Sequence, residues 1–314
     1  MARYRDHLPQ LEADVFLTDG GIETSLIFDD GIDLPDFAAF TLLDDADGRA
    51  ALTRYFDSYA AIARRDRVGV VLETPTWRAS PDWVVRRGYV VDDLDRIHRD
   101  AVDLLVEIRR RHENSQTPVV ISGCVGPRGD GYHPDALMTV GEARDYHSGG
   151  IQTYADTPAD LVTAVTMTYP DEAIGIAEAA RAAAIPAVIS FTVETDGRLP
   201  TGQSLSEAID TVDEATGRYP AYYMVNCAHP SHFADVLDPV EPWGHRIMGI
   251  RANASKLSHA ELDEAEELDS GDPDELASDY LALRRILPGL TVLGGCCGTN
   301  HRHIAAISSA CVAA

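Results

Sequence analysis

The sequence predicts an α/β protein whose eight parallel strands close into a single (β/α)8 TIM barrel. Eight short, β-branched and nearly continuous apolar runs recur along the 314 residues, as expected of strands that are covered on both faces. Amphipathic helical stretches lie between these runs, and no linker rich in Pro, Gly or Ser divides the chain. An open doubly wound sheet is the alternative, but it would usually carry a Gly-rich phosphate loop, which is absent here.

Each expected strand is an apolar run that ends in polar or thiol residues. In chain order, the strands are expected at residues 15–19, 69–74, 118–122, 161–168, 187–192, 222–226, 246–251 and 290–294. Helices are expected where apolar residues recur every three or four positions, which places them on one helical face. These stretches are residues 49–66, 94–108, 171–184, 204–216 and 275–287.

The charge of the chain excludes several classes of partner. Lys and Arg number 26 against 51 Asp and Glu, which gives a net charge of −25. Such an acidic surface repels phosphate backbones and anionic lipids, so neither nucleic acid nor membrane is an expected partner. The chain shows no apolar run of about 18 residues and no signal peptide, and its five cysteines are too few for a disulfide scaffold. We therefore expect a cytoplasmic protein with free thiols, and its oligomeric state stays open.

Three cysteines stand at the ends of the sixth and eighth strands, which flank the seventh. Cys227 follows the sixth run, and Cys296 and Cys297 follow the eighth between glycines. In a barrel, these two ends approach each other over the C-terminal face, where active sites of this fold lie. Three thiolates supply three corners of a tetrahedral Zn²⁺ site and leave the fourth open, as in catalytic zinc sites. The flanking glycines permit the sharp turn that would aim adjacent cysteines at one ion.

Other interpretations of these residues remain open. The adjacent cysteines could instead be buried small apolar residues or a strained disulfide. His301 or His303 could supply a ligand, although helix capping or surface exposure fits their spacing better. Glu73 and Glu194 could be the two carboxylates of a glycosidase barrel, but that interpretation leaves the cysteines unexplained.

The motifs at the strand ends resemble the homocysteine S-methyltransferase family, in order, from about residue 14 to residue 310. The G-G-C-C-G-T segment at 294–299, with an upstream Asn-Cys pair, is the most specific part of the match. The other matching segments are Asp19-Gly20-Gly21 with Glu23-Thr24, Glu73-Thr74, Gly126-Pro127 and Asn226-Cys227.

The resemblance implies one barrel domain over residues 1–314, with its core at about 14–312. It implies Zn²⁺ held by Cys227, Cys296 and Cys297 as the catalytic centre. It also implies methyl transfer from a small-molecule donor to the thiol of homocysteine, forming methionine. The donor would be a sulfonium, such as S-methylmethionine or S-adenosylmethionine, or a betaine. A different thiol acceptor, or a zinc- and thiol-binding regulatory barrel without transfer, is the alternative.

The resemblance also implies substrate contacts. Asp19 would pair with the α-ammonium of the amino acid, and the backbone N–H groups of Gly20 and Gly21 would hold its carboxylate. At the end of the fourth strand, Met167 stands where the family has a glutamate, which would reshape the acceptor pocket. The remaining expected substrate-binding residues are Glu23, Thr24, Glu73, Thr74 and Asn226.

Overall fold

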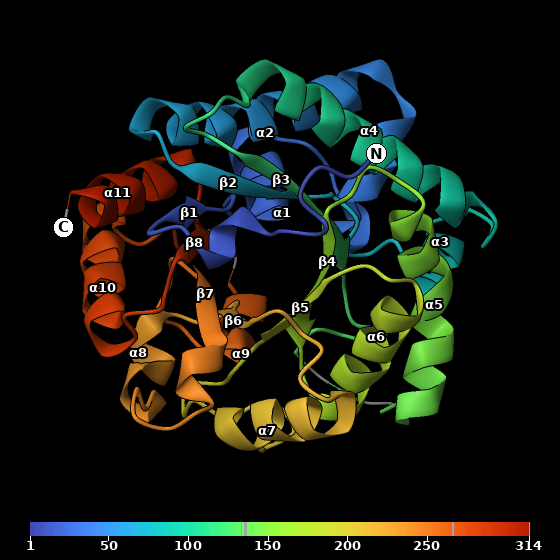
Figure 1. The fold of residues 1–314 in the computed structure, drawn as a ribbon. Coiled ribbons are helices and arrows are strands. Elements are labelled where there is room, and N and C mark those ends of the chain that lie inside the picture. The colour runs from blue at the N-terminus through green and yellow to red at the C-terminus, as the bar shows by residue number, and fades with distance from the viewer. Residues whose placement is uncertain (133, 135–136, 266, 314) are drawn as a thin grey trace.

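The computed structural model describes residues 1–132, 134, 137–265 and 267–313. Eight parallel strands pair in chain order, and β8 pairs with β1, so the sheet closes into a barrel (Figure 1). The strands are β1 Phe16–Leu17, β2 Gly69–Glu73, β3 Val119–Val125, β4 Leu161–Met167, β5 Ala187–Phe191, β6 Tyr223–Asn226, β7 Ile247–Ala252 and β8 Val292–Gly295. The predicted (β/α)8 barrel and each of its eight expected strands are confirmed.

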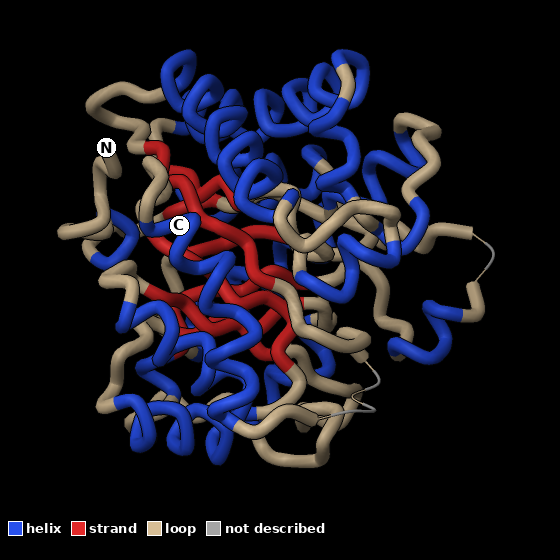
Figure 2. The backbone as a smooth tube through the Cα atoms, turned by 90° about the vertical axis from the view of Figure 1, so that its right-hand side faces the viewer, coloured by secondary structure: helices blue, strands red, loops and turns tan. Residues whose placement is uncertain are grey.

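Helices surround the barrel on its outer face, as Figure 2 shows with the strands enclosed among them. The long helices are α2 Ala46–Asp66, α4 Asp93–His112, α5 Val140–Ala155, α6 Pro170–Ala182, α7 Leu205–Thr216, α10 Pro273–Ile286 and α11 His301–Val312. Shorter helices are α1 Ile22–Thr24, α3 Pro81–Arg86, α8 Pro230–Phe233 and α9 His259–Asp263. Within the described residues, no helix combines the length and apolar character that crossing a membrane requires.

Helix α5 is absent from the sequence prediction. Its stretch contains the adjacent glycines Gly149 and Gly150, which weaken an apolar stripe. The structure shows why one of them is small: a Cβ on Gly150 would lie 2.8 Å from the ring of His98 in α4. A capping box between Thr139 and Glu142 marks the start of α5 and was the available signal.

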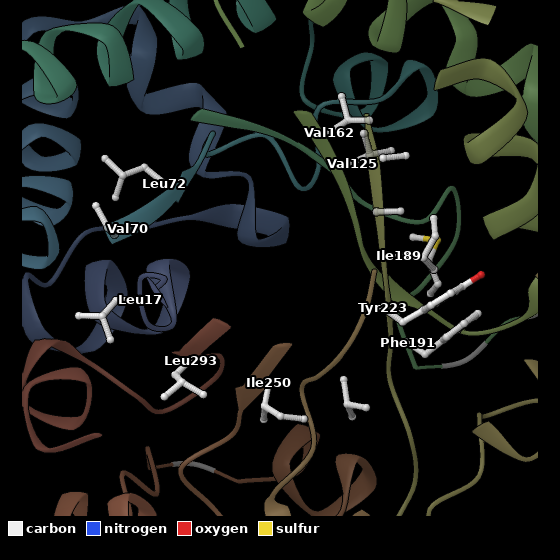
Figure 3. Packing of buried hydrophobic residues seen from close by; sticks show 14 of the residues in the cluster. Leu17, Val70, Leu72, Val125, Val162, Ile189, Phe191, Tyr223, Ile250 and Leu293 are labelled. Carbon is white, nitrogen blue, oxygen red and sulfur yellow. The ribbon is translucent and has the colours of Figure 1, made fainter. Parts of the chain in front are cut away.

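Two apolar layers hold the barrel together. One fills its interior and includes Phe16, Val120 and Met224. The other lies between the strands and the helices, and Figure 3 shows members of it such as Leu72 and Ile250. Alternate residues of each strand serve the two layers, because successive strand side chains point to opposite faces. This packing leaves the strand ends as the place where polar groups gather.

Candidate functional site

Three cysteine thiols lie together at the C-terminal mouth of the barrel. The ligand atoms of Cys227, Cys296 and Cys297 are all within 4.8 Å of one another, and the Cys227 and Cys297 sulfurs are 3.7 Å apart. All three side chains are free thiols, so the adjacent pair forms no disulfide. Two sulfurs bound to one tetrahedral zinc at about 2.3 Å would lie about 3.8 Å apart. The donor set therefore fits a zinc ion in both chemistry and spacing.

A tight turn after β8 aims the adjacent cysteines in one direction. Thr299 closes this turn: its backbone N–H and its hydroxyl both donate to the Cys296 carbonyl, at 3.1 and 2.7 Å. Gly298 has a φ of +77°, which favours glycine, and a Cβ on Gly295 would lie 2.1 Å from the Thr299 hydroxyl. The expected role of the flanking glycines is thus visible in the backbone.

Cys227 reaches the cluster through an unusual backbone conformation. Its φ is +54°, a left-handed value that costs a non-glycine residue roughly 1–2 kcal/mol. Two side chains hold its carbonyl in place: Asn253 Nδ2 donates to it at 3.0 Å, and His259 Nε2 at 2.6 Å. Strain of this kind persists where the surroundings over-determine it, and such places cluster at functional sites.

A tyrosine from the loop after β3 covers the thiols. The Tyr132 hydroxyl donates to Cys227 Sγ at 3.2 Å and lies 3.9 Å from Cys297 Sγ. The Tyr132 ring lies against the ring of His259, with 4.2 Å between centroids. His259 Nδ1 in turn lies 3.1 Å from Glu194 Oε1. The ring of His259 thus bridges the Glu194 carboxyl and the Cys227 carbonyl.

An open cavity of about 590 Å³ adjoins this cover. Glu194 and His259 line it on one side, together with Tyr132. Its remaining lining is mostly apolar: Pro134, Leu137, Pro200, Thr201 and Ala260. The cavity is the size of small-molecule sites and begins at the residues that cover the thiols.

The thiols share charge through hydrogen bonds. Bonds from Cys296 and Cys297 hold the pKa of the Cys227 thiol well below its usual range. The same coupling to Cys227 raises the pKa of Cys296 to about 12 and that of Cys297 well above its usual value. A cation at the centre of the three sulfurs would relieve this competition, because a metal ion deprotonates a coordinating thiol.

Arg251 in β7 pairs with two carboxylates of the mouth. Its guanidinium donates to Asp19 at 2.7 Å and also pairs closely with Glu73. Further bonds run from this guanidinium to the carbonyls of Gly20 at 3.2 Å and Gly295 at 3.1 Å. Asp19, Glu73 and Arg251 are all buried. Burial raises the pKa of Asp19 and raises that of Glu73 to about 7, and Arg251 opposes both shifts.

The glycine motif after β1 packs on the cysteine turn. The Gly21 N–H donates to the Thr299 carbonyl at 3.0 Å, and a Cβ on Gly21 would lie 2.5 Å from the Cys296 carbonyl oxygen. The Thr24 hydroxyl accepts from Gly298 N at 3.2 Å. The Gly20 carbonyl accepts from Tyr55 at 2.8 Å. Through these contacts, the glycine motif after β1 stabilises the turn that carries Cys296 and Cys297.

Two further residues expected to bind substrate, Thr74 and Asn226, use their polar side-chain atoms in hydrogen bonds within the barrel. The Thr74 hydroxyl accepts from Cys124 N at 2.9 Å and bonds to the Thr76 hydroxyl at 2.6 Å. Asn226 accepts from Thr166 N at 2.9 Å and donates to the Thr166 hydroxyl at 2.9 Å. Thr166 has a φ of +64° in an irregularity of β4, so Asn226 stabilises a bulge there.

Met167, just after this bulge, is fully buried in the layer between strands and helices. The structure therefore does not bring it to the thiols. Glu23 on α1, in contrast, is only partly buried and accepts a hydrogen bond from its own backbone N–H. Its pKa is raised to about 7, mainly by burial and also by the nearby Cys296 and Asp19, while its backbone hydrogen bond opposes the shift.

Sequence reasoning left Arg251 without a role and missed Tyr132 and His259 as site residues. Arg251 stands at an expected strand end, and a charged residue inside an apolar run was the available signal. Tyr132 lies in the loop after β3, and His259 is the first residue of the short helix α9, which begins with a capping box between Ser258 and Glu261. The two histidines considered as ligands have other roles: His301 is exposed, and His303 belongs to the capping box that begins α11.

The fold and the site together define a (β/α)8 barrel with three thiols at its catalytic face. A family model described as homocysteine S-methyltransferase matches residues 16–311. The chain belongs to the homocysteine S-methyltransferase family and is a methyltransferase.

Known relatives are similar at low identity. Homocysteine S-methyltransferase 1 of Arabidopsis thaliana is 22% identical over 256 residues, which cover 76% of this chain and 77% of that protein. Selenocysteine Se-methyltransferase of Brassica oleracea var. italica is 22% identical over 259 residues, covering 76% and 73%. The homocysteine methyltransferase MmuM from Escherichia coli, in its metallated form, is 18% identical, with a TM-score of 0.76 over 98% of this chain and 99% of that chain.

Proposed function

We propose that this protein transfers a methyl group from a small-molecule donor to the thiol of homocysteine, forming methionine, with Zn²⁺ held by Cys227, Cys296 and Cys297. The donor would be a sulfonium, such as S-methylmethionine or S-adenosylmethionine, or a betaine. The single observation that carries this proposal is the clustering of three thiols at the mouth of a barrel of this family.

The chemistry of the proposed site follows from its donor set. When bound, zinc would stabilise the acceptor as a thiolate near neutral pH. The acceptor sulfur then attacks the donor methyl carbon, a C–S bond forms, and the bond to the donor's sulfur or nitrogen breaks. The electron pair of that bond leaves with the donor, so a cationic donor departs as a neutral group. The cysteines hold the metal, and the surrounding residues orient both substrates.

The cavity of about 590 Å³ supports the presence of a second substrate. Glu194 and the ring of Tyr132 line it, and a carboxylate with an aromatic face suits a cationic donor. The free thiols of the site are consistent with the expected cytoplasmic setting, in which reductants keep cysteines reduced.

One specific observation favours a second candidate, in which the acceptor is another thiol. Asp19 and Glu73 are both bound by Arg251, and Met167 packs away from the mouth. The ammonium group of homocysteine therefore meets fewer free carboxylates than the motifs suggested. An acceptor without an α-ammonium would be less affected by this arrangement.

The test is methyl transfer assayed with reduced, zinc-loaded protein, homocysteine and each donor class in turn. We expect methionine to form, and removal of the metal by a chelator to abolish its formation. The variant C227S should lose the bound metal and the transfer together, whereas C311A, in helix α11, should keep both. Transfer that survives metal loss would contradict the role of zinc. Metal binding without any methyl transfer in the native protein would favour a regulatory barrel.

A further inference from the structure

Arg78, in the segment between β2 and α3, is a buried cation that the proposed chemistry does not use. Its side chain is 6% exposed, and its guanidinium carbon lies 4.0 Å from the ring centre of Trp77 and 3.8 Å from that of Trp83. Aromatic rings attract a cation through their faces and offer its N–H groups no acceptor atoms. Because a buried charge without hydrogen-bond partners is costly, this guanidinium needs acceptors from elsewhere.

One edge of the Arg78 guanidinium has the shape of a carboxylate receptor. Nη1 donates to the Gly129 carbonyl at 3.1 Å. On the other edge, Nε has no hydrogen-bond partner among the described residues, and the ion pair of Nη2 with Asp130 Oδ2 is 4.0 Å long, beyond hydrogen-bond distance. Arg246 shows the same edge in use, since its Nε and Nη2 donate to the two oxygens of Asp213 at 2.8 and 3.0 Å. The Nε–Nη2 edge of Arg78 is thus a fork of two donors that suits a bidentate carboxylate.

The loop after β3 connects this fork to the thiols. A Cβ on Gly131 would lie 3.1 Å from the ring of Trp77, on which the guanidinium of Arg78 packs. Tyr132, the next residue of the loop, places its hydroxyl 3.2 Å from Cys227 Sγ. Arg78 therefore stands at the mouth of the barrel, on the side of β2, while the thiols follow β6 and β8.

The surroundings of Arg78 also connect it with substrate binding. Burial lowers the pKa of Arg78, and Tyr132 and Glu23 are among the groups that oppose this shift. The backbone N–H of Gly21, which the motifs assigned to a substrate carboxylate, donates instead to the Thr299 carbonyl at 3.0 Å. A carboxylate at the mouth therefore has one partner fewer after β1 than the motifs suggested, and the fork of Arg78 can supply two donors.

Access to the fork leads past a short segment that contains two glycines. Gly129 and Gly131 flank Asp130, whose side chain is 47% exposed beside Nη2 of Arg78. A Cβ on Gly129 would meet no atom within 4 Å, so free space adjoins this segment. A substrate carboxylate can therefore approach Nη2 from the side on which Asp130 meets solvent.

We propose that the Nε–Nη2 edge of Arg78 binds the carboxylate of an amino-acid substrate at the mouth, which makes Arg78 a specificity-determining residue. This inference rests on the proposed function and names the recognition group of its substrates. Homocysteine and S-methylmethionine both carry such a carboxylate, so the group belongs to the acceptor or to the donor. In the second case, a methyl donor without a carboxylate would bind poorly.

A purely structural role for Arg78 would be to hold the Gly129 carbonyl and, with it, the loop after β3. Loss of that role would weaken all ligands of the mouth alike, whether or not they carry a carboxylate. Loss of carboxylate recognition would weaken only the ligands that carry one. The two roles therefore differ in selectivity between matched ligands.

Titration calorimetry of the zinc-loaded protein with two matched pairs of ligands separates these roles. Homocysteine is compared with 3-aminopropane-1-thiol, and S-methylmethionine with (3-aminopropyl)dimethylsulfonium, so that the second member of each pair lacks only the carboxylate. In R78Q, the Kd of the carboxylate-bearing member of one pair should rise about 10- to 100-fold, the loss expected of a charge-assisted bidentate contact. The Kd of its matched analogue should stay unchanged, which also shows that the variant is folded.

Two further variants sharpen the comparison. R78K keeps the charge without the fork, so its Kd should lie between those of the native protein and R78Q. R86Q is the matched control, because the exposed Arg86 lies over the same Trp83 ring at 5.1 Å, and it should bind all four ligands as the native protein does.

The pair that responds to R78Q identifies the source of the carboxylate, acceptor or donor. Equal rises for both members of each pair, or no rise for any ligand, would overturn the proposal in favour of the structural role. A native protein that prefers neither carboxylate-bearing ligand to its analogue would overturn it as well. A native protein that shows the expected selectivity but forms no methionine would instead refute the proposed function and leave the carboxylate site in place.

Discussion

Arg251 in β7 donates a hydrogen bond of 2.7 Å to Asp19, 232 positions away in the chain, just after β1. The same guanidinium pairs with Glu73 at the end of β2. One buried cation thus links residues from three strand ends and pairs with two carboxylates at the mouth. Asp19 and Glu73, which the motifs assign to substrate binding, therefore also hold the barrel strands together.

Removing this cation should be costly. In R251M, two buried carboxylates lose their partner, and we expect the free energy of unfolding to fall by about 3–5 kcal/mol. Urea denaturation of both proteins measures the difference. R99M removes an exposed arginine that pairs with Asp95 on the same helix, and its cost should stay below about 1 kcal/mol. Equal losses in the two variants would contradict the structural role of Arg251.

The titration of Glu73 should contribute to the pH dependence of the free energy of unfolding. Its pKa is about 7 in the folded protein and near 4.5 when unfolded, so the folded state binds the extra proton between these values. Stability from this group therefore falls as pH rises from about 5 to 7, by up to about 1.4 kcal/mol per pH unit. Unfolding measured at several pH values should show a flatter dependence in E73Q. An unchanged slope would mean that Glu73 titrates normally.

Glu23 should decide how well the site recognises a cationic acceptor. Its carboxylate is partly exposed near Cys296 and, among the residues that the structure describes, forms no ion pair like that of Asp19 with Arg251. In E23Q, the KM for homocysteine should rise about 10- to 100-fold, the loss expected of one charge-assisted hydrogen bond. The KM for 4-mercaptobutanoate, which lacks the ammonium, should stay unchanged.

Steady-state kinetics with both thiols tests this expectation, with E107Q on the exposed face of α4 as the matched control. A similar rise for both acceptors would show that Glu23 supports the fold of α1 and not the ammonium. Comparable metal content in the two variants would show that the thiol cluster is intact.

Asn226 should contribute mainly to stability. Its side chain satisfies two groups of Thr166, which has a left-handed backbone, and accepts from Ser190 at 2.6 Å. N226A leaves these buried groups unpaired, and we expect a loss of about 2–4 kcal/mol in unfolding experiments. N114A, in an exposed turn, is the comparison and should cost less than about 1 kcal/mol. A loss in methyl transfer without a loss in stability would instead indicate substrate contact.

The strands and the thiol cluster were predictable because each depends on a pattern of residues that are adjacent in the sequence. A strand buried on two faces needs a continuous apolar run, and glycines must surround adjacent cysteines that point the same way. The pairing of Arg251 with Asp19 follows no local pattern, since the two residues lie far apart in the sequence. No sequence pattern indicates the position of Tyr132 either, because its ring is placed by packing against His259, which is distant in the sequence. Helix α5 was missed since close packing on α4 selects glycine over apolar side chains.

The pairing of β8 with β1 has a consequence for the order of events during synthesis. Cys227 leaves the ribosome well before Cys296 and Cys297, which follow the strand that closes the barrel. Cys227 therefore has neither of the other two thiols beside it until β8 pairs with β1. If the proposed zinc site forms, metal binding would therefore require a closed barrel, because an incomplete barrel holds at most one of the three sulfurs in place.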